Sequence, residues 1–170
     1  MIHYQTNVAA LKQVGKWLDY LRETGTYDNS RIIIASDHGR SLWSIPYLQF
    51  KDNQFESYAP LLMVKDFNDT GFETSMEFMT NADIPTIATQ GLGFVAKNPF
   101  SNKEINMSEK FAHKQYITKS IEWDVSINNG KTFLPSDWLV FDSTAPNCNI
   151  YNPDNWGLIN DIVTLKNHSY

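Results

Sequence analysis

The first third of the chain shows a pattern of apolar residues that predicts a long helix. Residues 6–24, TNVAALKQVGKWLDYLRET, carry apolar side chains at spacings of three and four, which is typical of an amphipathic helix. Thr6 or Asn7 can cap its start, and Gly25 can take the left-handed conformation that ends a helix. The apolar stripe of this helix consists of Val8, Leu11, Val14, Leu18 and Leu21.

Two short apolar runs without alternation predict buried strands. Ile32–Ala35 is such a run, and an unbroken apolar run is typical of a strand covered on both faces, as in a parallel sheet. We therefore expect Ile32–Ala35 to be an interior parallel strand. Residues 60–67, PLLMVKDF, predict a second strand of the same type, and residues 26–30, TYDNS, have the composition of a turn. Helix, turn and buried strand make half of an α/β unit.

The remaining segments predict one more helix and a region rich in strands and loops. Residues 79–93 indicate a helix that starts near Asn81 or Ala82, with Pro85 in its first turn. Beyond about Asn98 the chain is richer in Asn, Ser and Pro, and three apolar runs there suit strands or short helices. These runs are KFAHKQYITKS, GKTFLPSDWLVFD and NWGLINDIVTL, and Pro135 in the second argues against a central strand at that position. We expect a single domain over residues 1–170, of class α/β, with a loop- and β-rich C-terminal third.

Composition narrows the classes of function. A chain of 170 residues with 42% hydrophobic residues is long and apolar enough for a core, and its net charge of −5 gives no sign of a nucleic-acid partner. The single cysteine, Cys148, excludes an internal disulfide framework, and no apolar run approaches the length of a membrane span. Because MIHYQTN runs straight into the helical pattern, we interpret the chain as part of a larger protein.

The residues after the first predicted strand suggest a metal site. Ile32–Ala35 is followed by Ser36 and then by Asp37, His38 and Gly39, and ligands bind at the carboxyl ends of strands in open α/β sheets. A carboxylate and an imidazole together suit Zn²⁺, Mn²⁺ or a similar divalent ion, and a glycine leaves room for a bound group. The alternative is a helix cap formed by Asp37 beside a surface histidine. A catalytic metal needs at least one more ligand, so we expect this pair alone to hold an ion weakly.

The context of this motif resembles the sulfatase and alkaline-phosphatase superfamily. The segment VGKWLDYLRETG and the following YDNSRIIIASDHG are similar to the helix and the SDHG strand end of that superfamily. YAPLLMVKDF, residues 58–67, is similar to its strand RVPLIVxxP, and NADIPTIATQGLG, residues 81–93, to its segment xDIxPTILxLxGI. The three segments occur in the superfamily's order across roughly the first 95 residues.

The resemblance implies a fold and an activity. The fold is the C-terminal part of an alkaline-phosphatase-like sandwich, a mostly parallel sheet flanked by helices. The activity is that of a metal-dependent sulfuric-ester hydrolase, with phosphoethanolamine or glycerol-phosphate transfer to a cell-envelope substrate as the alternative. A non-catalytic remnant is the third reading. The resemblance assigns the metal, Zn, Mn, Ca or Mg, to Asp37 and His38, and it places the nucleophile upstream of this chain. It also implies a sulfate or phosphate ester as substrate, membrane attachment only through an N-terminal region outside this chain, and an extracytoplasmic or periplasmic location.

Other residues have candidate roles that compete with structural ones. Arg40 suits contact with a sulfate or phosphate oxygen. His113 suits a second metal ligand, since some members of the superfamily use a downstream histidine, and His3 suits approach to the metal site. Each of the three also suits an exposed surface position. Cys148 follows the motif, so we read it as a small buried thiol and not as the nucleophile. Asp83 and Thr86 match the superfamily's D and PT positions and are expected mainly to shape a helix start, whereas four tryptophans suit either a ligand groove or the core. These are Trp43, Trp123, Trp138 and Trp156.

Overall fold

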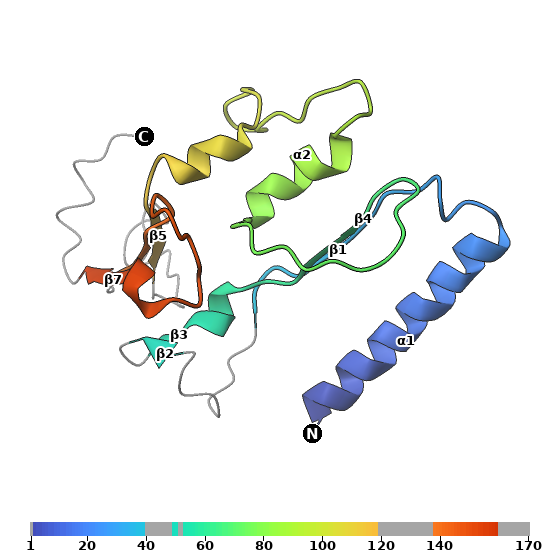
Figure 1. Ribbon diagram of the computed structural model, residues 1–170, viewed down its shortest axis with the longest axis horizontal. Helices are drawn as coiled ribbons and strands as arrows, with labels where there is room; N and C mark the ends of the chain where they lie inside the picture. The colour runs from blue at the N-terminus through green and yellow to red at the C-terminus, as the bar shows by residue number, and fades with distance from the viewer. Residues whose placement is uncertain (1, 40–48, 51–52, 119–137, 160–170) are drawn as a thin grey trace, which may run out of the picture. The chain divides into compact units, whose positions relative to one another are not determined.

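The computed structural model describes residues 2–39, 49–50, 53–118 and 138–159, which form a mixed α/β structure (Figure 1). The α-helices are α1 (Ile2–Glu23) and α2 (Ile84–Thr89), and the 3₁₀-helices are η2 (Phe55–Tyr58), η3 (Asn81–Asp83), η4 (Met107–Phe111) and η5 (Pro153–Asn155). The strands are β1 (Ile32–Ala35), β2 (Gln49–Phe50), β3 (Asn53–Gln54), β4 (Leu62–Lys65), β5 (Gln115–Thr118), β6 (Trp138–Phe141) and β7 (Trp156–Ile159). In the described part of the chain, no helix is long and apolar enough to cross a membrane.

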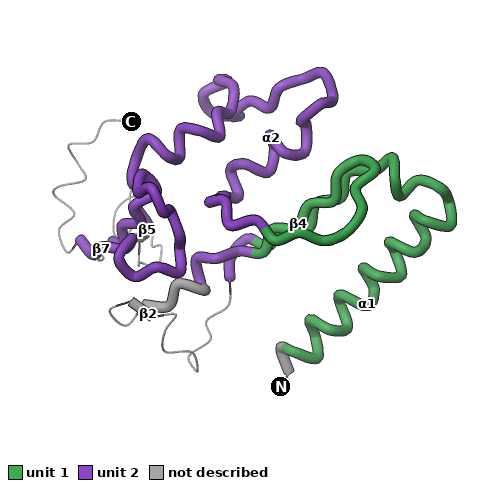
Figure 2. The backbone as a smooth tube through the Cα atoms, in the orientation of Figure 1, with its two compact units in different colours: residues 1–36, 61–74 green, residues 37–60, 75–170 purple. Residues whose placement is uncertain are grey.

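The chain divides into two compact units, which Figure 2 shows in different colours. Unit 1 consists of residues 1–36 and 61–74, and unit 2 consists of residues 37–60 and 75–170. Unit 1 holds α1 and the strands β1 and β4, whereas unit 2 holds the motif residues after Ser36 and the C-terminal sheet. Each unit is described by itself below.

Helix α1 confirms the predicted helix but begins at Ile2, so Thr6 and Asn7 lie inside it and do not cap its start. Its end follows the sequence prediction closely. Gly25 has φ of 69°, its N–H donates to the carbonyl of Arg22, and the N–H of Thr26 donates to the carbonyl of Leu21. This pair of bonds is the Schellman motif, which satisfies carbonyls that would otherwise lack an intrahelical partner.

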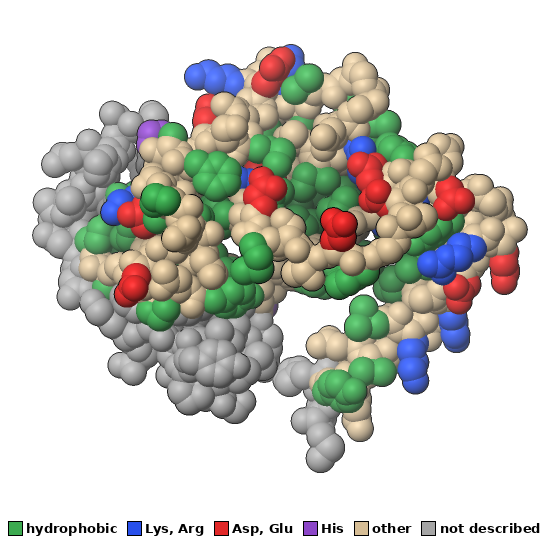
Figure 3. All heavy atoms as spheres, viewed as in Figure 1, with side chains coloured by type: hydrophobic (Ala, Val, Ile, Leu, Met, Phe, Trp, Pro, Cys, Tyr) green, Lys and Arg blue, Asp and Glu red, His purple; other side chains and the backbone are tan. Residues whose placement is uncertain are grey.

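The predicted apolar stripe of α1 is only partly covered. Val8, Val14, Leu18 and Leu21 are half-buried, whereas Leu11 is 55% exposed. On the visible face of α1, Figure 3 shows apolar side chains alongside basic ones. Four of the five stripe residues are therefore partly covered, but the described part of unit 1 does not bury the stripe fully.

The strands β1 and β4 lie where the sequence predicts them, but the prediction of an interior parallel strand is wrong for the described residues. β1 pairs with β4 in antiparallel register, Ile32 opposite Lys65 and Ala35 opposite Leu62, in a sheet of two strands. Of β1, only Ile32 is buried. The described strands of the other sheets are also paired antiparallel, so the structure is α/β in content without showing a parallel sheet.

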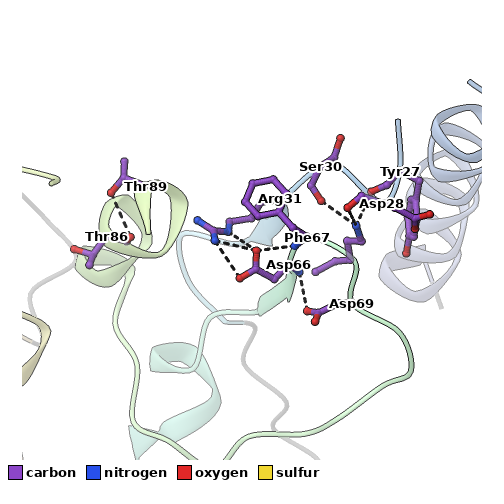
Figure 4. Close-up of polar contacts among 10 residues, drawn as sticks. Tyr27, Asp28, Ser30, Arg31, Asp66, Phe67, Asp69, Thr86 and Thr89 are labelled. Carbon is purple, nitrogen blue, oxygen red and sulfur yellow. Dashed lines mark hydrogen bonds and ion pairs between the residues drawn. The ribbon is translucent and has the colours of Figure 1, made fainter. Parts of the chain in front are cut away.

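An ion pair and several hydrogen bonds join the segments at one end of the β1–β4 ribbon (Figure 4). Arg31, just before β1, donates from Nε to Oδ1 of Asp66 at 2.9 Å and from a terminal nitrogen to Oδ2 at 3.1 Å. Lys65, the last residue of β4, donates to the carbonyls of Tyr27 and Ser30 in the turn before β1. These contacts join the segments that flank both strands, and the Arg31 fork is bidentate, the stronger form of such a pair.

Unit 2 contains the main core, built on the antiparallel sheet β5–β6–β7. Strands or short helices were expected for the three apolar runs of the C-terminal third, and each run contributes one strand of this sheet. Pro135 lies outside the described residues. Leu139, Phe141 and Trp156 are buried, and partly buried side chains pack against them. These are Tyr58, Phe78, Ile117, Cys148, Ile150 and Leu158.

The predicted helix at residues 79–93 is shorter than expected. It consists of η3 followed by α2, which ends at Thr89, and Pro85 lies in the first turn of α2 as predicted. Gly91 and Gly93 have φ of 77° and 80°, a left-handed conformation that does not continue a helix. The pair of glycines in TQGLG thus ends the helix early.

Candidate functional site

Asp37 and His38 lie side by side at the surface of unit 2. Their side chains are 91% and 72% exposed, respectively. The backbone N–H of His38 donates to Oδ1 of Asp37 at 3.0 Å, which turns the carboxylate toward the next residue. The two functional groups therefore face a common region.

The imidazole of His38 is held in a defined tautomer by its neighbour. Its Nδ1 atom lies 2.6 Å from the carbonyl oxygen of Gly39. Because a carbonyl oxygen can only accept, Nδ1 carries the proton in the neutral ring, and Nε2 carries the lone pair. Metal-binding histidines commonly donate their second ring nitrogen to a backbone carbonyl in this way.

The distance between the two candidate ligand atoms tests whether they fit one ion. Nε2 of His38 lies 3.9 Å from Oδ1 of Asp37. Two ligands of one tetrahedral Zn²⁺, each at about 2.1 Å, are about 3.4 Å apart, so a small rotation of either exposed side chain brings both atoms into reach. The donor set fits two positions of a coordination shell. Among the described residues, no group of three or more His, Cys, Asp and Glu side chains is placed to hold a metal ion.

The backbone of the motif is fixed to two other segments of unit 2. The N–H of Gly39 donates to the carbonyl of Ser57 at 3.1 Å, and Nδ2 of Asn81 donates to the carbonyl of Asp37 at 3.1 Å. Asn81 is the first residue of η3, so the predicted helix start also positions the motif. The side chains of Asp37 and His38 are exposed, but the peptide that carries them is anchored at both ends.

A pocket of about 330 Å³ opens beside this pair, entirely within unit 2. Asp37 and His38 belong to its lining, together with polar residues such as Ser57, Asn81 and Gln115. The apolar part of the lining includes Tyr58, Phe78, Ile117, Phe141, Ile150 and Trp156. Polar groups at the surface and buried rings thus border the same cavity, an arrangement typical of small-molecule sites.

The other candidate residues are not brought to this pocket by the described structure. His113 is exposed and is not part of the pocket lining, and its carbonyl accepts a hydrogen bond from Ser143. His3 lies in the first turn of α1, and its side chain is outside the described part, as is Arg40 altogether. Their proposed substrate contacts stay predictions.

Cys148 has the environment expected for a structural thiol. It packs against the core of unit 2, and burial raises the pKa of its thiol above the ordinary value, with the nearby Asp142 carboxylate acting in the same direction. A raised pKa lowers the fraction of reactive thiolate at neutral pH. The structure therefore supports packing as the role of Cys148.

Asp83 shapes the start of a helix, as the sequence analysis expected. Its Oδ2 accepts from the backbone N–H of Thr80 at 2.7 Å, from the Thr80 hydroxyl at 3.1 Å and from Nζ of Lys110 at 2.8 Å. The first contact is one half of a capping box. The third contact links Asp83 to η4.

Thr86 lies in α2 and accepts at its carbonyl from the Thr89 hydroxyl, a contact drawn in Figure 4.

The aromatic part of the pocket was not assigned by sequence reasoning, apart from Trp156 among the candidate groove tryptophans. Tyr58, Phe78 and Phe141 come from three separate segments, and no spacing along the chain relates them. Trp138 is half-buried in β6, and Trp43 and Trp123 lie outside the described residues. Only the paired strands and the turns between them bring these rings together.

Comparison of this chain with protein-family models, with curated proteins and with solved structures finds no match in any of the three.

Proposed function

We propose that this chain is part of a metal-dependent sulfuric-ester hydrolase and supplies two ligands of its catalytic metal, Asp37 and His38. The observation that carries the proposal is the geometry of His38, whose Nδ1 is bound to a carbonyl while Nε2 faces the carboxylate of Asp37. A histidine that is merely exposed on the surface needs neither the bond from Nδ1 to a carbonyl nor a carboxylate beside Nε2. The order of the three superfamily-like segments supports the same assignment.

The proposed enzyme has the fold and setting of that superfamily. The β1–β4 ribbon would lie in the larger sheet of an alkaline-phosphatase-like sandwich, and the remaining metal ligands and the nucleophile would come from a part of the protein outside this chain. The location would be the extracytoplasmic or periplasmic side of a membrane. A transferase of phosphoethanolamine or glycerol phosphate is the alternative, because the superfamily that the chain resembles includes both classes.

In this proposal the chain's own residues bind the metal ion and hold the metal-binding residues in position. Asp37 offers an anionic oxygen, and His38 offers a neutral nitrogen whose orientation is set by Gly39. A divalent ion, Zn, Mn, Ca or Mg, would polarise the ester oxygen and lower the pKa of the nucleophile. Asn81 and Ser57 hold the backbone of the motif in place through their contacts with Asp37 and Gly39.

Metal binding by the chain itself tests the assignment. Titration with Mn²⁺ should broaden the NMR signals of the His38 ring before those of His113, since of these two described histidines only His38 has a carboxylate partner within 4 Å. Asp37→Ala should abolish this preference, and Asp154→Ala, which removes another exposed carboxylate, should leave it unchanged. Equal broadening of the two histidines would overturn the proposal.

Activity gives a second test. The chain alone should not turn over 4-nitrophenyl sulfate or 4-nitrophenyl phosphate, because the proposed nucleophile lies outside it. In a complete enzyme that contains this chain, Asp37→Ala and His38→Ala should each remove both metal and turnover. A complete enzyme that keeps full metal content and normal turnover in both variants would show that the motif is only a turn.

A further inference from the structure

A short hairpin in unit 2 carries the most exposed of the large apolar side chains that the structure describes. The hairpin spans residues 96–105, in the yellow part of the chain after α2 (Figure 1). Its two arms meet at an antiparallel bridge between Lys97 and Glu104. Phe100 lies at the tip and is 98% exposed, so nearly its whole ring is available to a partner of this chain.

The tip of this hairpin needs no water for its backbone N–H groups. Oδ1 of Asn98 accepts from the N–H of Phe100 at 2.9 Å and from the N–H of Ser101 at 3.1 Å. The carbonyl of Asn98 accepts from the N–H of Asn102 at 2.8 Å, and the N–H of Asn98 donates to the carbonyl of Lys103 at 2.8 Å. The remaining tip residue is a proline, which has no N–H. An N–H group without an acceptor makes entry into an apolar medium costly, so these bonds prepare the tip to leave water.

Two unpaired lysines flank the tip. Lys97 and Lys103 are exposed, and neither has a carboxylate of the described residues within 4 Å. Lys97 lies opposite Glu104, and Asn98 is bonded to Lys103, so the two lysines stand on opposite faces of the hairpin. Because the whole chain has a net charge of −5, this positive charge is a local feature of the hairpin.

We propose that the hairpin at residues 96–105 docks on an anionic phospholipid surface, with Phe100 inserted among the lipids and Lys97 and Lys103 on lipid phosphates. A lysine stem can lie along apolar surface while its ammonium group stays at the headgroups. Cations on both faces of the tip suit a layer of phosphates around it, which favours a lipid surface over an apolar pocket of another protein. The superfamily resemblance implies membrane attachment only through a region outside this chain, so this contact goes beyond it and does not depend on the metal site.

Binding of the unmodified chain to vesicles tests the proposal. Vesicles of phosphatidylglycerol and phosphatidylcholine in about equal parts should bind the chain with half-saturation at about 1 mM lipid or below. Binding to pure phosphatidylcholine should be at least about fivefold weaker, and raising NaCl from about 0.1 to about 1 M should weaken binding to the mixed vesicles. Equal binding to both vesicles would overturn the proposal. Absence of binding to either would also overturn it and would leave a protein pocket as the partner of the tip.

Matched variants locate the contact on the chain. Phe100→Ala should weaken binding to the mixed vesicles at least about tenfold, whereas Phe72→Ala, at an 83% exposed position in unit 1, should leave it unchanged. Lys103→Gln should weaken binding about fivefold, and Lys12→Gln, at an exposed position of α1, should not. Equal effects within either pair would overturn the proposal.

Fluorescence shows whether the tip enters the lipid. Phe100→Trp and Phe72→Trp carry the same number of tryptophans, so a difference between their spectra reports the new side chain. With the mixed vesicles, the emission of Phe100→Trp should shift to shorter wavelength and be quenched by lipids brominated in their acyl chains, and that of Phe72→Trp should not. The same response in both would overturn the proposal. Asp37→Ala should bind the vesicles like the unmodified chain, so a failure of the proposed metal site leaves this result unaffected.

Discussion

The Nζ atom of Lys110 lies 2.8 Å from Oδ2 of Asp83, and the two side chains are only 8% and 4% exposed. This buried pair links η4 to η3, whose last residue is Asp83, and the same carboxylate oxygen also accepts from Thr80. Removing one partner of a buried ion pair leaves a charge without compensation, which is far more costly than losing a surface pair.

Lys110→Met should therefore lower the free energy of unfolding by about 3–5 kcal/mol, measured by urea denaturation. Lys103→Met is the control, because Lys103 is exposed and its replacement should change the free energy of unfolding by less than about 0.5 kcal/mol. Equal effects of the two substitutions would show that the Lys110–Asp83 contact contributes nothing to stability.

Two phenylalanines provide a test of where the core lies. Phe141 is 1% exposed in the centre of unit 2, whereas Phe100 is 98% exposed. Phe141→Ala should lower the free energy of unfolding by about 3–5 kcal/mol, because it removes buried contacts and leaves a cavity. Phe100→Ala should change it by less than about 0.5 kcal/mol. A small effect at Phe141 would mean that the β5–β6–β7 sheet is not the core.

Replacing Gly15 or Gly25 with alanine should change the free energy of unfolding in opposite directions. Gly15 lies inside α1 with nothing within 4 Å of an added Cβ, so Gly15→Ala should stabilise the chain by about 0.5–1 kcal/mol. Gly25 has φ of 69° at the helix end, so Gly25→Ala should destabilise it by about 1–2 kcal/mol. Thermal unfolding of the two variants is the measurement, and the same sign for both would contradict the Schellman ending of α1.

The pH dependence of stability should report on Asp66. The backbone N–H of Phe67, followed by Arg31, holds the pKa of Asp66 below its ordinary value of 3.8. Because the folded state lowers this pKa, the stabilisation is fully present above the ordinary value and is lost as the pH falls through the lower folded one.

Asp66→Asn should thus destabilise the chain at neutral pH, and the difference from the unmodified chain should shrink once the pH falls below about 4. Denaturation of both proteins at matched pH values measures that difference, in which contributions from other carboxylates cancel. A difference that stays constant between neutral pH and pH 3 would contradict the assignment.

Local sequence patterns predicted most of the elements because each depends on nearby residues. The helix over residues 6–24 and its glycine ending follow from apolar spacing and from the freedom of Gly25, and both are present in α1. The strand runs at residues 32–35 and 60–67 likewise became β1 and β4. The helix start at Asn81 depended on Asp83 and Pro85, both visible in the sequence.

Strand direction and burial were not predictable in the same way. An unbroken apolar run such as Ile32–Ala35 indicates a strand whose faces are buried by other segments. It does not show which segment pairs with the strand, or whether the pairing is parallel or antiparallel. The register with β4 is set by partners more than 25 residues away, among them the Arg31 and Asp66 pair. The same limit explains why Leu11 was assigned to the buried stripe although it is exposed.

The candidate site also combines features that depend on neighbouring residues with features that depend on distant segments. Asp37 and His38 are adjacent in the sequence, so their proximity could be predicted from the motif itself. The tautomer of His38 depends on a local turn, which the pattern Asp-His-Gly suggests but does not specify. The aromatic wall formed by Tyr58, Phe78 and Phe141 requires three segments to converge, which only the folded chain shows.

The described sheets all pair strands that are distant in the sequence, apart from the short β2–β3 hairpin. Ile32 lies opposite Lys65, Gln115 opposite Phe141, and Phe141 opposite Trp156. Each pairing must close a long loop before any strand contact compensates for the lost chain entropy. Helix α1 can form within about a microsecond by local contacts alone. Folding of this chain should therefore be limited by the meeting of its strands, on a timescale of milliseconds to seconds.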